Sequence, residues 1–289
     1  MASSYIPFVN YVLKFLNFFI RLFKTNLDPN CDSNRDIFQL ASSRGFQLEE
    51  HEVITKDGYI LKLHRLVNPL NEDKSGSKPV LCLHGFGCTS THFLIASNDG
   101  QAISPIDTHL PGYKMSSNMG FALSNAGHDV WLANTRGNVH SLKHVTLSVS
   151  DVEFWNFSLD ELIAHDLPSL IDYVLKITNH SRLSLVGFSQ GTSQVFGLLS
   201  SRPEYNSRID HFFALGPVTR LTNAKPPLRY FMKDSRLCVA RDKLMGGRGR
   251  GAPALAAALT KGHIFAPLVL KLVHFFHCCL VGFNHEQRK

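Results

Sequence analysis

The sequence predicts an α/β fold in which a mostly parallel sheet carries helices on both faces. Between residues 52 and 215, short apolar runs of strand length alternate with segments of helical spacing. Two of the apolar runs end directly in glycine-containing turns, at residues 84–87 and 187–191. In a parallel sheet the carboxyl ends of the strands meet at one edge, so we expect both turns to lie at the same functional edge.

The 289 residues divide into three segments of different charge. Residues 1–27 carry three basic residues and no acid, and residues 28–219 carry 14 basic and 20 acidic residues. The remaining 70 residues carry 13 basic and 3 acidic residues, so the formal charge of +7 comes from this tail. We therefore expect an apolar N-terminal segment at 1–27, an α/β core at 28–220, and a divergent basic tail or partial cap at 221–289. No zinc-finger spacing and no basic–aromatic stripe points to nucleic acid.

The N-terminal segment is apolar and aromatic over residues 5–24. It lacks a basic start and a small-residue cleavage site, so it is not an ordinary signal peptide. Three alternatives remain open: an atypical signal-anchor, an amphipathic helix lying on a membrane, and a helix packed on the core. The first two predict a chain that starts at a membrane or passes through one.

The first half of the core is predicted from turn residues and alternation. A short helix is expected at 37–43, and Asp57-Gly58 favours a hairpin between strands at 52–55 and 59–66. The apolar run at 79–83 predicts a buried strand.

The second half alternates helix and strand. The expected elements are a helix at 117–125, a strand at 130–133, a long helix at 156–177 kinked at Pro168, a strand at 183–186 and a strand at 209–215.

The turn Gly187-Phe188-Ser189-Gln190-Gly191 joins the strand at 183–186 to a following helix. A Gly-x-Ser-x-Gly turn in this setting is the nucleophile elbow of the α/β-hydrolase fold. Side chains at the two flanking positions should collide with the strand or the helix, which explains both glycines. The pattern predicts Ser189 as a nucleophile beside a helix N-terminus.

The strand at 79–83 ends in His84-Gly85-Phe86, which resembles the other half of that signature. The loop after this strand and the residue after the nucleophile each supply one oxyanion-hole N–H. We therefore expect the backbone N–H groups of Phe86 and Gln190 to form that hole. His84 is expected to shape the turn and not to act in catalysis.

The remaining polar motifs give weaker signals. The six cysteines contain no C-x-x-C pair, and no metal site is expected at His274 and His277. Two N-glycosylation sequons start at Asn156 and Asn179. We expect Asn156 to be partly buried among aromatic residues and Asn179, in a loop, to be the better acceptor.

The chain resembles the acid lipase family, the gastric and lysosomal lipases of the α/β-hydrolase fold. Four blocks carry the resemblance: EEHEVITKDGYILKLHRL (49–66), PVLCLHGFG (79–87), DVWLANTRGN (129–138), and the continuous run from 154 to 193. The resemblance implies cleavage of triacylglycerols or cholesteryl esters without a cofactor, in the secretory pathway, at a membrane or lipid interface. It also implies the roles given above for Ser189, Phe86 and Gln190.

Two departures from the family pattern bear on activity. Phe188 stands where the family usually has histidine. After residue 215 no acid and base follow a strand as the triad of the family does, and Asp242 with His263 is only the nearest approach to such a pair. The fold is therefore expected to be incomplete at its C-terminus. The triad acid and base remain unknown, which leaves three alternatives: a weak or inactive ester hydrolase, a non-catalytic lipid-binding protein, and a hydrolase with a rebuilt triad.

Overall fold

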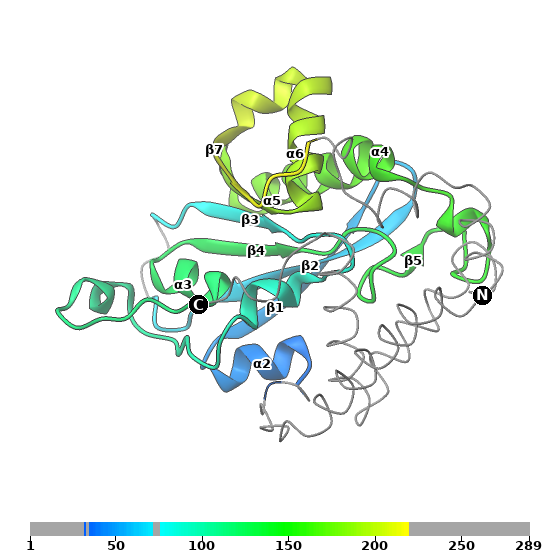
Figure 1. Ribbon diagram of the computed structural model, residues 1–289. Helices are drawn as coiled ribbons and strands as arrows, with labels where there is room; N and C mark the ends of the chain where they lie inside the picture. Colours follow the sequence, from blue (N-terminus) through cyan, green and yellow to red (C-terminus); the bar gives the residue numbers. More distant parts are fainter. Residues whose placement is uncertain (1–31, 33–34, 72–75, 220–289) are drawn as a thin grey trace, which may run out of the picture. The chain divides into compact units, whose positions relative to one another are not determined.

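The computed structural model describes residue 32, residues 35–71 and residues 76–219, shown in colour in Figure 1. The apolar segment at 5–24, the tail at 221–289 and the candidates Asp242 and His263 lie outside the described residues. What the sequence predicts for them stays a prediction.

The core is one sheet with seven described strands, ordered β1-β2-β4-β3-β6-β7, with β5 paired to β2 (Figure 1). The strands are β1 (Gln47–Ile54), β2 (Tyr59–Val67), β3 (Pro79–Leu83), β4 (Asp129–Ala133), β5 (Lys143–His144), β6 (Leu183–Phe188) and β7 (Ile209–Leu215). Strand β3 is buried along its whole length, and it lies between β4 and β6 in the middle of the sheet. A central strand buried on both faces explains the unbroken apolar run at 79–83.

The sheet is mixed. Strands β4, β3, β6 and β7 are parallel neighbours, whereas β1, β2 and β5 pair antiparallel. The antiparallel part follows from the tight turn at Gly58, whose φ of +97° suits glycine and returns the chain directly beside β1. The predicted parallel arrangement therefore holds for the half of the sheet that carries both glycine turns.

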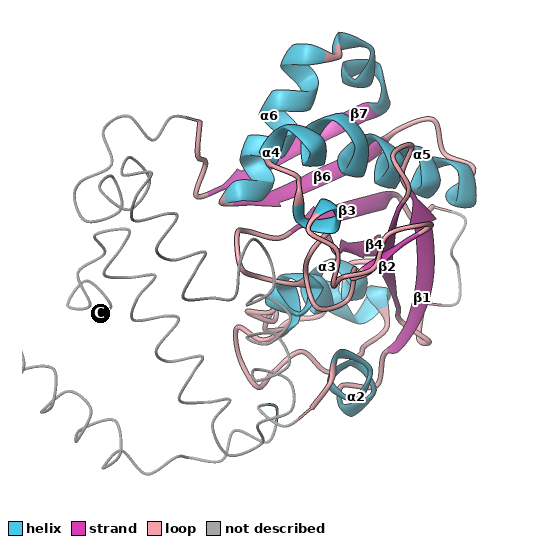
Figure 2. Cartoon of the chain, turned by 90° about the vertical axis from the view of Figure 1, so that its right-hand side faces the viewer, coloured by secondary structure: helices cyan, strands magenta, loops and turns pink. Residues whose placement is uncertain are grey.

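Helices cover both faces of the sheet, as predicted (Figure 2). One core cluster packs α5 (Leu167–Thr178) and α6 (Gln190–Ser201) on the sheet, and a second packs α2 (Ile37–Ser43) and α3 (Met119–Asn125) on the opposite face. The short helical turns are η2 (Ser90–Leu94), η3 (Pro105–His109), η4 (Glu153–Trp155), α4 (Leu159–Glu161), η5 (Leu162–Asp166) and η6 (Pro203–Arg208). This two-sided cover gives the α/β class that the alternation of strands and helices predicts.

The single long helix predicted at 156–177 is wrong in its start and its regularity. Its first turn begins after Ser158, which forms a capping box with Glu161. The segment Leu162–Asp166 is a π-helix, in which the Leu167 N–H donates to the Leu162 carbonyl. Pro168 has no N–H to continue an α-helical ladder at this point, so the widened turn falls directly before it.

Strand β1 begins five residues earlier than the sequence predicts. The prediction fell short because the residues at the start of the strand are mostly polar. All eight residues from Gln47 to Ile54 pair with β2. An edge strand exposes part of its length to water, and charged side chains there discourage pairing with other chains. Glu49, Glu50 and Glu52 occupy exposed positions of this strand. With these charged residues the segment does not show the apolar alternation from which a strand is predicted.

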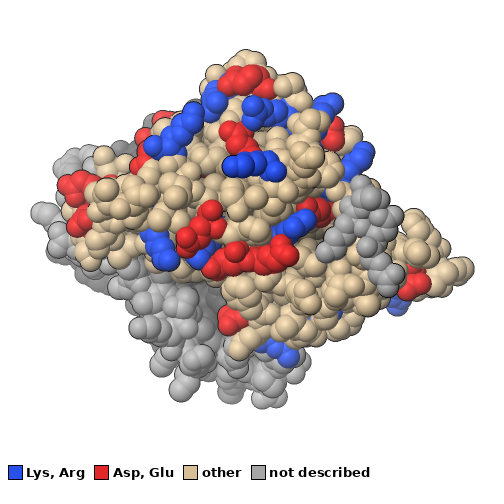
Figure 3. Space-filling view, turned by 180° about the vertical axis from the view of Figure 1, so that it is seen from behind, with Lys and Arg blue, Asp and Glu red and all other residues tan. Residues whose placement is uncertain are grey.

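On the face shown in Figure 3, basic and acidic side chains are interspersed. Typical exposed pairs are Arg182–Asp210 and Arg202–Glu204, each at 2.9 Å between nitrogen and oxygen. No helix among the described residues has the length and apolarity that a membrane span requires.

Candidate active site

Ser189 stands at the tip of a strained turn between β6 and α6. Its backbone angles are φ 51° and ψ −114°, a region that non-glycine residues rarely adopt and that costs about 1–3 kcal/mol. The Ser189 N–H donates to the Leu215 carbonyl at 2.9 Å, and its carbonyl accepts from the N–H and the hydroxyl of Thr192. These bonds hold the turn between the ends of β6, β7 and α6, and Ser189 itself is half-buried.

The glycines on either side of this turn are required by close backbone contacts. A Cβ atom on Gly191 would lie 2.5 Å from the carbonyl oxygen of Leu83. One on Gly187 would lie 3.0 Å from the carbonyl carbon of Gly191. Position 191 therefore excludes a side chain and position 187 leaves a Cβ atom in unusually tight contact with backbone, which supports the steric reason given for the Gly-x-Ser-x-Gly pattern.

The two glycine turns lie next to each other, as predicted. Leu83 pairs with Gly187 at the carboxyl ends of β3 and β6. A Cβ atom added to Gly85 would lie 3.1 Å from the Cβ atom of Ser189, so the loop after β3 touches the tip of the elbow. The sheet thus places the loop that contains Phe86 directly beside the predicted nucleophile.

The two predicted oxyanion donors lie on the two sides of this contact. Gln190 is the first residue of α6, where a helix leaves its backbone N–H groups without intrahelical partners. Phe86 follows Gly85 in the loop, and its side chain is 74% exposed. Among the described residues no bond from the Phe86 N–H to another loop or strand is present, and the electrostatics of a helix N-terminus favour negative charge beside Gln190.

Ser189 Oγ has no hydrogen-bond partner among the described residues. The described part of the chain therefore assigns no base to this hydroxyl. It also holds no group of three or more side chains that could bind a metal ion.

His84 is buried directly behind the Phe86 loop. Its Nδ1 lies 2.8 Å from the Gly85 carbonyl, and its Nε2 lies 3.1 Å from Nδ2 of Asn138 and 3.3 Å from the N–H of Thr135. Burial lowers the pKa of His84 to about 4, so the ring is neutral at pH 7. A neutral ring with both nitrogens engaged supports the prediction that His84 shapes the turn.

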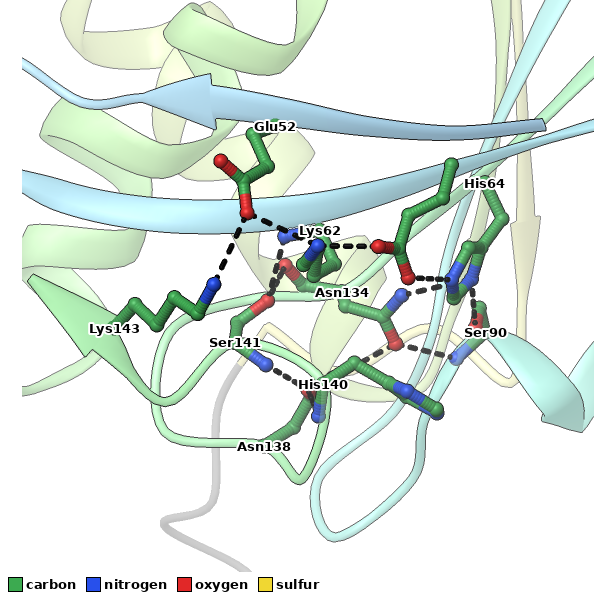
Figure 4. Close-up of polar contacts among 10 residues, drawn as sticks. Glu52, Lys62, His64, Ser90, Asn134, Asn138, His140, Ser141 and Lys143 are labelled. Atoms are coloured by element: carbon green, nitrogen blue, oxygen red, sulfur yellow. Dashed lines mark hydrogen bonds and ion pairs between the residues drawn. The ribbon is translucent and has the colours of Figure 1, made fainter. Parts of the chain in front are cut away.

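A polar network joins Asn138, which contacts His84, to His64 on β2 (Figure 4). Asn138 donates to Oδ1 of Asn134 at 3.0 Å, and the same oxygen accepts from the N–H of Ser90. Nδ1 of His64 lies 3.3 Å from the Asn134 amide and 3.0 Å from the Ser90 hydroxyl. On its other side, Nε2 of His64 lies 3.4 Å from Glu50. Loop 134–138 is thereby joined to the segment that follows the Phe86 loop.

Arg136 also holds this loop in place. Its guanidinium contacts the carboxylate of Asp166 at 2.6 and 2.7 Å and that of Asp57 at 2.6 and 2.9 Å. It also lies 3.9 Å from the centre of the Tyr59 ring. Burial raises the pKa of Asp166 to about 6 against the opposing effect of Arg136. Sequence analysis missed these contacts, although Asn134-Thr-Arg-Gly-Asn138 follows a strand at the functional edge.

A second histidine packs beside the elbow. The rings of His92 and Phe188 are stacked at 4.3 Å between centroids, with 24° between their planes. Burial lowers the pKa of His92. The aromatic residue before Ser189 is thus covered by an imidazole from the segment that follows the Phe86 loop.

Both sequons are accessible. Asn179 ends α5 in the left-handed conformation, with φ 53°, and its side chain is exposed as expected. Asn156 was expected to be partly buried, and this is wrong: Phe154 packs inward while Asn156 ends η4 and faces solvent.

Comparison with known proteins agrees with this fold. Residues 37–97 match a family described as the partial alpha/beta-hydrolase lipase region, and residues 78–237 match the alpha/beta hydrolase fold. The chain is 40% identical over 206 residues to the human lysosomal acid lipase/cholesteryl ester hydrolase, covering 71% of this chain and 47% of that protein.

Other relatives give similar values. The chain is 36% identical over 202 residues to the gastric triacylglycerol lipase of Mus musculus, covering 69% of this chain and 47% of that protein. It is 37% identical over 184 residues to a probable lipase of Schizosaccharomyces pombe, covering 64% of this chain and 38% of that protein. The chain thus spans about half the length, or less, of these relatives. By its matched region it belongs to the α/β-hydrolase family, among the gastric and lysosomal acid lipases.

Proposed function

We propose that this protein is a lipase-family ester hydrolase in which Ser189 is the nucleophile. The observation that carries the proposal is the backbone of Ser189, a non-glycine residue with φ 51° between two glycines at which a Cβ atom would lie 3.0 Å or less from backbone atoms. Strain of this kind persists where the surrounding structure enforces it, and such sites are commonly functional. Because Ser189 stands at the carboxyl end of a parallel strand, its hydroxyl group is presented to substrate.

In the proposed reaction Ser189 Oγ attacks the ester carbonyl while a general base takes its proton. The N–H groups of Phe86 and Gln190 donate to the oxygen that becomes negatively charged, each contributing about 3 kcal/mol. The base then protonates the leaving alcohol, and water repeats the sequence on the acyl-enzyme. No cofactor enters this chemistry. The triad acid and base remain unassigned.

The proposed substrates are lipid esters, either triacylglycerols or cholesteryl esters. The names of the mouse and human relatives support this substrate class. The strongly exposed Phe86 adds an apolar side chain at the rim of the site, where an acyl chain or a lipid interface would approach.

Labelling with a fluorophosphonate tests the nucleophile. We expect the full chain to be labelled and Ser189→Ala to lose the label. Ser193→Ala is the matched control on the same helix, because the hydroxyl of Ser193 donates to the Val218 carbonyl. Equal labelling of wild type and Ser189→Ala excludes Ser189. No labelling, combined with retained fatty-acid binding, supports a lipid-binding protein instead.

We further propose that the protein enters the secretory pathway, as the names of its gastric and lysosomal relatives suggest. Expression in a secreting eukaryotic host should then produce a glycan at the exposed Asn179. Asn179→Gln should remove one glycosidase-sensitive step in gel mobility, and Lys176→Gln, on the preceding turn, should not. A protein that carries no glycan at Asn179 and stays in the cytosol would contradict this placement.

A further inference from the structure

The side-chain amide of Asn138 has only one orientation that satisfies its neighbours. Its Oδ1 accepts from the backbone N–H groups of His140 and Ser141, at 2.9 and 3.1 Å. Rotating the amide by 180° would turn an NH₂ group toward these two donors. The NH₂ group therefore faces the other way, where one hydrogen reaches Oδ1 of Asn134 and the other reaches Nε2 of His84.

This orientation decides the tautomer of His84. Because Nε2 receives a hydrogen bond from Asn138, it must carry the lone pair of the neutral ring. The proton is then on Nδ1, which lies 2.8 Å from the carbonyl oxygen of Gly85. That oxygen can only accept, so the assignment from Asn138 and the assignment from Gly85 agree.

The carbonyl of Gly85 and the N–H of Phe86 belong to one peptide unit. A trans peptide is planar, and its C=O and N–H point in opposite directions. Fixing the Gly85 carbonyl against the His84 ring therefore also fixes the direction of the Phe86 N–H. The same carbonyl also accepts from the N–H of Cys88 at 3.2 Å, which closes the turn.

From these contacts we infer that His84 is a positioning residue for the oxyanion hole. As the Nδ1–H tautomer held by Asn138, it fixes the Gly85–Phe86 peptide so that the Phe86 N–H is directed for a substrate at Ser189. Burial of His84 and its lowered pKa keep the ring neutral, so the tautomer persists at pH 7. This inference rests on the proposed function for its catalytic meaning, but the tautomer itself does not.

Two substitutions separate positioning from packing. Asparagine at position 84 places its NH₂ group near the place of Nδ1 and can still donate to the Gly85 carbonyl, whereas glutamine places its amide near Nε2 and cannot. We expect His84→Gln to slow fluorophosphonate labelling of Ser189 by at least about tenfold, since removal of one oxyanion donor costs about 10²–10³ in rate. His84→Asn, which leaves a larger void, should label several-fold faster than His84→Gln.

The matched control is the buried His64, which belongs to the same network but does not contact the Gly85 carbonyl. His64→Asn and His64→Gln should show no such preference once rates are corrected for the folded fraction. Equal labelling of His84→Asn and His84→Gln would overturn the positioning role.

Nitrogen-15 NMR of the full chain decides the inference independently of labelling. We expect a protonated Nδ1 and an unprotonated Nε2 at His84, and a Phe86 amide resonance that shifts more in His84→Gln than in His84→Asn. A protonated Nε2 in the wild type would overturn the inference even if Ser189 is labelled. If Ser189 is not labelled, the proposed function fails and the NMR result alone decides whether His84 fixes this peptide.

Discussion

At the scale of single residues, the candidate site depends on Gly187 and Gly191, because neither has a Cβ atom, which would crowd nearby backbone. The turn at Ser189 brings the start of α6 so close to the end of β3 that a Cβ atom on Gly191 would overlap the Leu83 carbonyl. Neither partner can move easily, because Leu83 belongs to a fully buried central strand. The strained conformation of Ser189 therefore depends on the close approach of α6 to β3.

This contact makes Gly191→Ala a severe substitution. We expect it to lower the free energy of unfolding in urea by about 1–3 kcal/mol, as overpacking of a rigid core does, and to abolish labelling of Ser189. Gly197→Ala is a matched control in the same helix. Its Cβ atom would also come within 2.5 Å of an atom, but that atom is Cδ1 of Ile163, at the end of a flexible side chain. It should change stability by under about 1 kcal/mol, and an equal loss in both variants would contradict the steric account.

At the scale of elements, Arg136 joins three segments that are distant in sequence. It reaches the hairpin turn at Asp57 and the π-helical turn at Asp166, and it lies in the loop after β4. The side chains of Arg136 and Asp166 are 1% and 0% exposed, so each depends on the other to compensate for lost hydration. The π-helical turn and its buried carboxylate thereby support the loop that holds His84.

Removal of the Arg136 guanidinium should therefore lower the stability of the fold strongly. We expect Arg136→Met to reduce the free energy of unfolding by about 3–5 kcal/mol, because it leaves the Asp166 carboxylate buried without its partner. The double substitution Arg136→Met/Asp166→Asn should recover part of this loss. The control Arg182→Met breaks a half-exposed pair with Asp210 and should cost about 0–1 kcal/mol. Similar losses in both single variants would mean that burial of the Arg136 cluster is unimportant.

The same elements show why the sequence predicted the helix at 156–177 incorrectly. Apolar residues at helical spacing continue through the segment, so periodicity alone indicates one helix. Pro168 was expected to kink it, and the structure instead widens the turn before it. Asp166, the last residue of this π-helical turn, is buried and pairs with Arg136, which lies 30 residues earlier, so local periodicity carries no sign of this contact.

At the scale of the whole molecule, three buried titratable groups link stability to pH. The pKa values of His64 and His84 are lowered to about 4 by burial, whereas that of Asp166 is raised to about 6. Between pH 4 and 6.5 the unfolded chain binds more protons at the two histidines than the folded chain does. Their contribution is therefore complete above pH 6.5 and is lost as the pH falls toward 4. Asp166 acts in the opposite sense, since its raised pKa makes stability fall as the pH rises from about 4 to 6.

The two histidines outweigh the one carboxyl group, so acid should destabilise the protein in this window. One pKa unit corresponds to 1.36 kcal/mol, which gives a net loss of about 3 kcal/mol between pH 6.5 and 4. Urea unfolding at half-unit steps of pH measures it. His64→Gln should reduce the dependence of the unfolding free energy on pH by roughly half or more. An unchanged slope in that variant would show that His64 does not cause the loss of stability in acid.

The sequence alone determined the elbow, the loop after β3 and the α/β class of this protein. These features follow from short stretches: two glycines around a serine, an apolar run of buried-strand length, and the change of period between strand and helix. Tertiary structure decided the length of the polar edge strand β1, the mixed sheet and the supports of the site. The bond from Asn138 to His84 joins residues 54 positions apart. Such a contact leaves no local pattern, because it depends on how the sheet brings two loops together and on which polar groups remain to be satisfied once both are buried.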